Sequence, residues 1–221
     1  MEDWFKQKEL TLEDQWRGII LFGRNVASYK FALAKALFDL KPKAGQLLKM
    51  DELALPYALH LAEHLKHSDK QITSASSKFL DGCRRYNQDQ DTNALIEQTV
   101  RLGFSNVIDA FHVVGKSDIP QRFYIDERKR NDGIRTTDEF DQLQRGTQSD
   151  NLNAEVESRW RLVETAWDLG MTRSLVSVDY DPATELLFTL DRSKRRKSVT
   201  GSRGALNGYQ GNPPIFSWGQ K

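Results

Sequence analysis

A helical repeat of large apolar residues constrains the fold of this chain more than any other feature. Four of them recur at i, i+4, i+7 and i+11 within residues 154–169: Val156, Trp160, Val163 and Trp167. Gly170 follows and can end the helix. A helix with two Trp side chains on one face needs other elements to cover that face. We therefore predict that Trp160 and Trp167 are buried anchors of a core.

Capping residues and helix breakers predict helices over most of the remaining sequence. Thr11 and Asp14 have the spacing of a capping box, which begins a helix that runs to Phe22. Ser28 is the expected N-cap of a second helix, and Pro42 stops it. A third helix is expected to start near Pro56 and run toward His67. Shorter helices are predicted at residues 77–86, 93–102 and 106–113.

Two later regions break the helical pattern. Residues 116–151 mix charges with turn formers and read as a long surface excursion, with an extended piece at Phe123–Ile125 and a short helix at Thr137–Leu143. Leu175–Val178 and Leu186–Leu190 read as strands joined by a turn at residues 179–182. The predicted fold is mainly α, a helical bundle-like body with a small C-terminal β-hairpin. Residues 1–190 form this body, and residues 191–221 form a basic segment and tail.

Composition narrows the class of protein. Hydrophobic residues make up 38% of the 221 residues, enough for a folded core. No apolar stretch is long enough to cross a bilayer, and the N-terminus does not resemble a secretory signal. The single cysteine, Cys83, excludes an internal disulfide. These features predict a cytoplasmic protein without a membrane partner.

Charge is distributed unevenly along the chain. Residues 191–221 contain seven basic residues and one acid, a net charge of +6, whereas residues 1–190 carry a net charge of −5. Five of the six residues 192–197 are basic, a pattern suited to phosphate oxygens and hence to DNA. The candidate nucleic-acid-binding residues are Arg192, Lys194, Arg195, Arg196, Lys197 and Arg203. A second cluster, Arg128–Arg130, is a weaker candidate because acids surround it.

Other chemistry is less well supported by the sequence. His60, His64 and His67 share a spacing that could hold a metal ion, but a polar, exposed helix face is favoured. Four acids could serve a metal-dependent nuclease with Lys194: Asp179, Asp181, Glu185 and Asp191. The spacing of these acids fits poorly with the metal ligands of such a nuclease. Cys83 is expected to be structural, and residues 22–30 fit a junction between helices better than a phosphate loop. No catalytic residue and no metal ligand is assigned.

Several strings together resemble the N-terminal region of a bacterial HNH endonuclease family. The strings are WRGIILFGRNVASYKFAL (residues 16–33), VIDAFH (107–112), RFYIDER (122–128), RWRLVETAW (159–167) and ALNGYQ (205–210). They span nearly the whole chain. The resemblance implies hydrolysis of DNA phosphodiesters by the full-length family, with a divalent metal as its cofactor.

The resemblance implies no catalytic residue here. In the family, the segment matching residues 206–210 leads into a cysteine-bearing stretch and the His-Asn-His core, but no His follows His112 in this chain. The sequence after Gln210 is expected to be a truncation or a shifted reading frame. We therefore expect a DNA-engaging or assembly region that is not catalytic alone and contains no cofactor, with a protein partner or a homo-oligomer left open. The alternatives are a non-catalytic protein-interaction module and a complete nuclease that uses the hairpin acids.

Overall fold

α-Helices form most of the structure, a computed structural model that describes residues 10–22, 27–74, 76–115 and 117–168 and the strands at 179–181, 186–190 and 196–198. The helical elements are α2 (Leu12–Arg17), the π-helical turn η1 (Gly18–Phe22), α3 (Tyr29–Leu40), α4 (Met50–Leu65), α5 (Lys78–Asp89), α6 (Thr92–Leu102), α7 (Val107–Ala110), α8 (Arg128–Asn131), α9 (Asp138–Arg145) and α10 (Ser149–Asp168). The prediction of a mainly α fold is confirmed.

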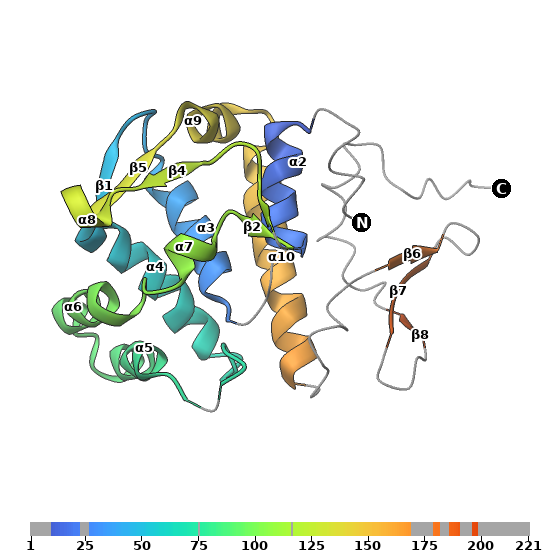
Figure 1. Ribbon diagram of the computed structural model, residues 1–221. Helices are drawn as coiled ribbons and strands as arrows, with labels where there is room; N and C mark the ends of the chain where they lie inside the picture. Colours follow the sequence, from blue (N-terminus) through green and yellow to red (C-terminus); the bar gives the residue numbers. More distant parts are fainter. Residues whose placement is uncertain are drawn as a thin grey trace.

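Three small antiparallel sheets accompany the helices. The first has the order β1-β5-β4, from β1 (Leu47–Lys49), β5 (Gly133–Thr136) and β4 (Tyr124–Asp126). The second pairs β2 (Val113–Val114) with β3 (Ser117–Asp118). The third has the order β6-β7-β8, from β6 (Asp179–Asp181), β7 (Leu186–Leu190) and β8 (Arg196–Ser198). Figure 1 shows the first sheet and α9 at one end of the helical body, with α5 and α6 at the other.

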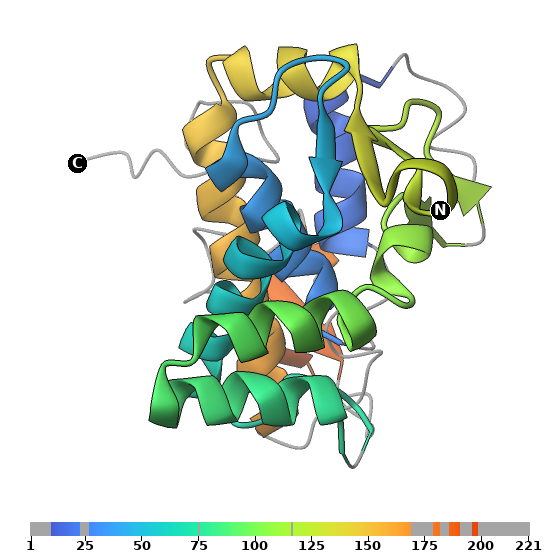
Figure 2. The same cartoon turned by 90° about the vertical axis from the view of Figure 1, so that its left-hand side faces the viewer.

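The core lies where α3, α4 and α10 pack together, and α5 and α6 cover the far side of α4 (Figures 1 and 2). Trp16 is its aromatic centre at one end, in edge contact with the rings of Phe38 and Phe123. Trp160 and Trp167 have exposed fractions of 0% and 4%. Both predicted anchors are therefore buried, and α10 contributes to the core along its length.

Local capping explains where two helices begin. The capping box at Thr11 is confirmed, because the N–H of Asp14 donates to Thr11 Oγ1 and the Asp14 carboxylate accepts from the Thr11 N–H. The predicted start of the next long helix near Pro56 is wrong, since α4 already begins at Met50. The Glu52 carboxylate accepts the N–H of Lys49 at 2.8 Å and so caps an earlier start. Pro56 is accommodated inside α4.

The prediction that residues 116–151 form a surface excursion is wrong. Phe123, Tyr124, Ile134 and Phe140 are all buried, and β5 is the central strand of the first sheet. A Cβ at Gly133 would collide with the Leu48 carbonyl oxygen, so glycine permits the close approach of β5 to β1. Pairing partners that lie almost ninety residues apart leave no local signal in the sequence.

The boundaries predicted for the C-terminal strands need one correction. Residues 179–181, expected to form a turn, are strand β6, and Tyr180 pairs with Leu187 of β7. Strand β7 has the predicted bounds, whereas residues 175–178 and 182–185 lie outside the described residues. Within the part of the chain described here, no helix is long and apolar enough to cross a bilayer.

Candidate functional site

Within the basic segment predicted to bind DNA, the structure describes only residues 196–198. Arg196 and Lys197 lie on β8, where they pair with Leu190 and Thr189 of β7. Because β8 is an edge strand of its sheet, one side of its backbone is not paired within that sheet. The other predicted residues, Arg192, Lys194, Arg195 and Arg203, lie outside the described residues. Of the hairpin acids, Asp179 and Asp181 lie on β6, and Glu185 and Asp191 fall outside as well.

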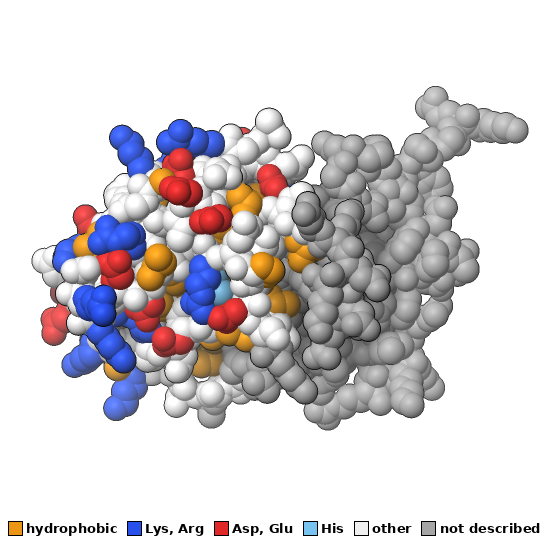
Figure 3. All heavy atoms as spheres, turned by 45° about the horizontal axis from the view of Figure 1, so that its top comes forward, with side chains coloured by type: hydrophobic (Ala, Val, Ile, Leu, Met, Phe, Trp, Pro, Cys, Tyr) orange, Lys and Arg blue, Asp and Glu red, His pale blue; other side chains and the backbone are white. Residues whose placement is uncertain are grey.

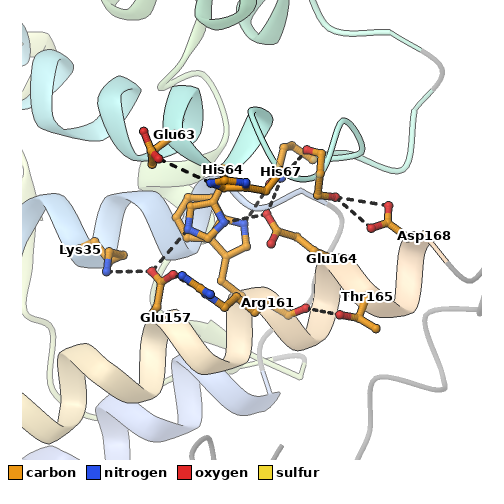
Figure 4. A network of polar contacts seen from close by, with 12 residues as sticks. Lys35, Glu63, His64, His67, Glu157, Arg161, Glu164, Thr165 and Asp168 are labelled. Atoms are coloured by element: carbon orange, nitrogen blue, oxygen red, sulfur yellow. Dashed lines mark hydrogen bonds and ion pairs between the residues drawn. The ribbon is translucent and has the colours of Figure 1, made fainter. Parts of the chain in front are cut away.

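A second polar site lies in the interior, between α4 and α10. The imidazole of His64 stacks on the indole of Trp160, with ring centroids 3.5 Å apart and planes within 3°. Its Nδ1 lies 2.7 Å from Glu164 Oε1, and its Nε2 lies 3.4 Å from Glu157 Oε2. Figure 4 shows this ring between the two helices, with both carboxylates reaching it from α10. The doubly protonated imidazolium can therefore donate to both acids.

Further groups complete this network. The Glu164 carboxylate also accepts from the side-chain amide of Gln71, whose oxygen accepts from the Trp160 indole N–H at 2.9 Å. On the other side, Glu157 is bound by Lys35 Nζ of α3 at 2.9 Å and by Arg161 Nε at 2.8 Å. We call His64, Gln71, Glu157, Trp160 and Glu164 the His64 network. It joins α4, α10 and the loop after α4, and the ion pair between Lys35 and Glu157 connects it to α3.

Electrostatics favour the charged form of this histidine. Burial alone would lower the pKa of His64, but the hydrogen bonds to Glu157 and Glu164 outweigh burial and raise the pKa above its ordinary value. The hydrogen bond from His64, opposed by burial and assisted by Lys35 and Arg161, holds the pKa of Glu157 well below the ordinary value. The network therefore acts as an ionic clamp inside the fold.

The exposed histidine face predicted for α4 is wrong at its centre. His64 is buried because it lies two helical turns after Tyr57, which is also buried, and so shares its face. His60 instead contacts Asp39 at 2.6 Å, and His67 is exposed beside Glu63. The three rings therefore have different partners. Among the described residues, no group of three or more His, Cys, Asp or Glu side chains is arranged to hold a metal ion.

Two buried cations surround the π-helical turn η1. Lys30 Nζ donates to the Ile19 carbonyl at 2.8 Å, and Arg159 Nη2 donates to the Leu21 carbonyl at 3.0 Å. Burial, with a smaller contribution from the nearby Arg159 charge, lowers the pKa of Lys30 to about 7. Ser28 precedes α3 as predicted, but its hydroxyl is buried and does not cap the helix. Lys30 and Arg159 thus bind carbonyls of η1 from α3 and α10, which is a structural role.

His112 and Cys83 are buried, and neither has a hydrogen bond or ion pair with an acid among the described residues. His112 Nε2 accepts the N–H of Phe123 at 3.0 Å, which fixes the neutral ring as an acceptor. Burial, assisted by the Arg122 charge, lowers the pKa of His112 to about 3. Burial likewise raises the pKa of Cys83 to about 12, so the thiol is not a nucleophile at neutral pH. The prediction of a structural cysteine agrees with this environment.

An open cleft of about 780 Å³ lies between the end of α3 and the junction of α9 with α10. Its charged lining residues are Asp39, Lys41, Lys43, Asp141, Arg145 and Asp150. Asp39 is bound to His60 and Asp141 to Arg145, so two of the acids are already paired. Lys41 and Lys43 are exposed and have no ion pair within the described ranges.

Known protein families, curated proteins and solved structures offer no match to this chain.

Proposed function

We propose that this chain engages DNA as an accessory region of an HNH-type endonuclease and does not cleave DNA by itself. The observation that carries the proposal is the run of five basic residues in the six positions 192–197. Its last members, Arg196 and Lys197, belong to the strand β8, so this part of the run is attached to a sheet. Contacts from such a run go mainly to phosphates, which position a protein without reading bases.

The alternative, a protein-interaction module, depended on an acidic body and an exposed histidine face. The acidic net charge of residues 1–190 remains. The histidine face does not, because His64 is buried and His60 is occupied by Asp39. DNA engagement is therefore the stronger of the two proposals.

Binding titrations against a fluorescent duplex at several salt concentrations test the proposal. Each phosphate neutralised contributes about −0.9 to the slope of log K against log salt. Replacing Arg195, Arg196 and Lys197 by Ala should make the slope less steep by roughly two to three units. An unchanged slope in this variant, or no binding by the unaltered chain even at low salt, would favour the interaction module. Incubation of the unaltered chain with duplex and Mg²⁺ should leave the DNA intact.

A further inference from the structure

A set of cations that form no ion pair with the described residues lies on the helical body, far in sequence from the basic segment. The cluster Arg128–Arg130 is a weak candidate for DNA binding in the sequence because acids surround it. In the structure, its three residues have different partners. The Arg128 guanidinium forms ion pairs with Asp126 and Asp109, with an N–O distance of 2.7 Å to each. Lys129 and Arg130 are exposed and form no ion pair with any described residue. Of the three cations, only Arg128 therefore forms an ion pair with a described acid.

Strand pairing brings lysines of another segment beside these two residues. Residues 41–49 contain three lysines and no acid. Lys49 lies opposite Gly133 in the β1–β5 ladder, and its Nζ donates to the carbonyl of Asn131, the last residue of α8. At the other end of the segment, the Lys43 carbonyl accepts from the Thr136 hydroxyl at 2.7 Å. Positions 133 and 136 are three strand residues apart, about 10 Å.

The resulting surface follows β5 from the cleft beside α9 to the helix α8. We call it the β1–α8 surface, and its cations are Lys41, Lys43, Lys49, Lys129 and Arg130. Acids also lie beside it. Asp51, Glu52 and Asp132 adjoin Lys49 and α8 in sequence, Asp126 and Glu127 lie near Lys129 and Arg130, and Asp39, Asp141 and Asp150 line the cleft with Lys41 and Lys43. Figure 3 shows Lys and Arg side chains gathered at one end of the helical body, with Asp and Glu side chains between them. Most of these acids have partners of their own: Asp126 binds Arg128, Glu127 binds Arg135, Asp39 binds His60, Asp141 binds Arg145, and Glu52 accepts the Lys49 N–H. The five cations form no ion pair with any described residue.

We infer that the β1–α8 surface is a second contact for the DNA phosphate backbone. This inference rests on the proposed function and extends it, because it adds a docking surface on the helical body to the basic segment. Long, exposed and unpaired lysine and arginine side chains suit repeated phosphate charges, since they need no fixed geometry to exchange counterions. The contact orients the duplex and does not read its sequence.

A matched pair of variants tests the inference. The first replaces Lys43, Lys129 and Arg130 by Gln, since none of their side chains has a hydrogen bond or ion pair within the described residues. The control replaces Lys70, Lys78 and Arg85 by Gln, which are exposed on and before α5 and remove the same charge. The surface variant should make the salt slope of duplex binding less steep by two to three units. The control should change the slope by less than one unit.

Several results would overturn the inference. An unchanged slope in the surface variant excludes the surface as a DNA contact, and equal changes in both variants show that only net charge matters. Displacement of the duplex by polyglutamate at equal charge concentration would indicate an acidic protein as the partner instead. If the unaltered chain does not bind the duplex at low salt, the proposed function itself fails. If it binds and only the Arg195, Arg196 and Lys197 variant loses affinity, this inference alone fails. Melting temperatures confirm that both variants are folded.

Discussion

Charged groups serve opposite purposes in the His64 network and on the β1–α8 surface. In the interior, His64 lies between two carboxylates, and these are bound in turn by Lys35, Arg161 and Gln71. On the surface, Lys43, Lys129 and Arg130 have solvent around them and no acid in contact among the described residues. Paired and buried charges hold elements together, whereas exposed and unpaired charges remain available to a partner. Changes in the first region should alter stability, and changes in the second should alter binding.

The largest expected effect belongs to Trp160. Replacing it by Ala removes a fully buried indole, the stacking partner of His64 and the donor to Gln71. The free energy of unfolding should fall by about 3–5 kcal/mol in denaturant titrations. Leu59→Ala on the exposed face of α4 is the control and should cost far less. Equal losses in the two variants would contradict the place we give Trp160 in the core.

The dependence of the free energy of unfolding on acidic pH should distinguish His112 from His64. The pKa of His112 is lowered to about 3 in the fold. Below pH 6.5, the imidazole therefore binds a proton in the unfolded chain but stays neutral in the native protein. Stability should therefore fall as the pH drops from 6.5 toward 3. His112→Gln keeps an acceptor for the Phe123 N–H but does not titrate. Between pH 6.5 and 4, the parent should lose about 2–3 kcal/mol more than this variant. Parallel stability curves would show that the ring is not held neutral.

His64 should show the opposite dependence. Because its pKa is raised in the fold, its stabilisation is complete below pH 6.5 and is lost as the pH rises through the native pKa. His64→Gln should be less stable than the parent at pH 6 by about 1–2 kcal/mol, and the gap should narrow toward pH 9. Glu164→Gln, which removes one of the two acids, should weaken this pH dependence. A gap that widens with pH would contradict the clamp.

The smallest expected effect on stability lies on the β1–α8 surface. Replacing Lys43, Lys129 and Arg130 by Gln changes only exposed side chains and removes no ion pair found in the described part of the chain. The free energy of unfolding should stay within about 0.5 kcal/mol of the parent. A loss as large as that expected for His64→Gln would mean that these cations are structural after all.

Local signals predicted part of this architecture. The capping box at Thr11 and the apolar repeat around Trp160 need only near neighbours in sequence, and both predictions are confirmed. The β1–β5 pairing and the contact between His64 and Glu164 join residues 84 to 100 positions apart, so no local pattern could reveal them. The burial of His64 could have been predicted from the sequence, because His64 shares a helix face with Tyr57 at a spacing of seven residues.

The candidate site was predictable to a smaller extent. The run of cations at 192–197 is visible in the sequence, and two of its members lie on β8. Lys129 and Arg130 were underrated because sequence proximity to Asp126 does not say which cation that acid binds. Side-chain geometry assigns it to Arg128. The lysines of residues 41–49 lie near Lys129 and Arg130 only because β1 pairs with β5.

The salt dependence of duplex affinity for the unaltered chain tests the central claim most directly. If the basic segment and the β1–α8 surface both contact phosphates, log K should fall against log salt with a slope steeper than about −4, at about −0.9 for each contact. Affinity should change little between duplexes of unrelated sequence. A slope shallower than about −1, or no binding at the lowest salt concentration, would contradict the claim that the basic segment and the β1–α8 surface contact DNA.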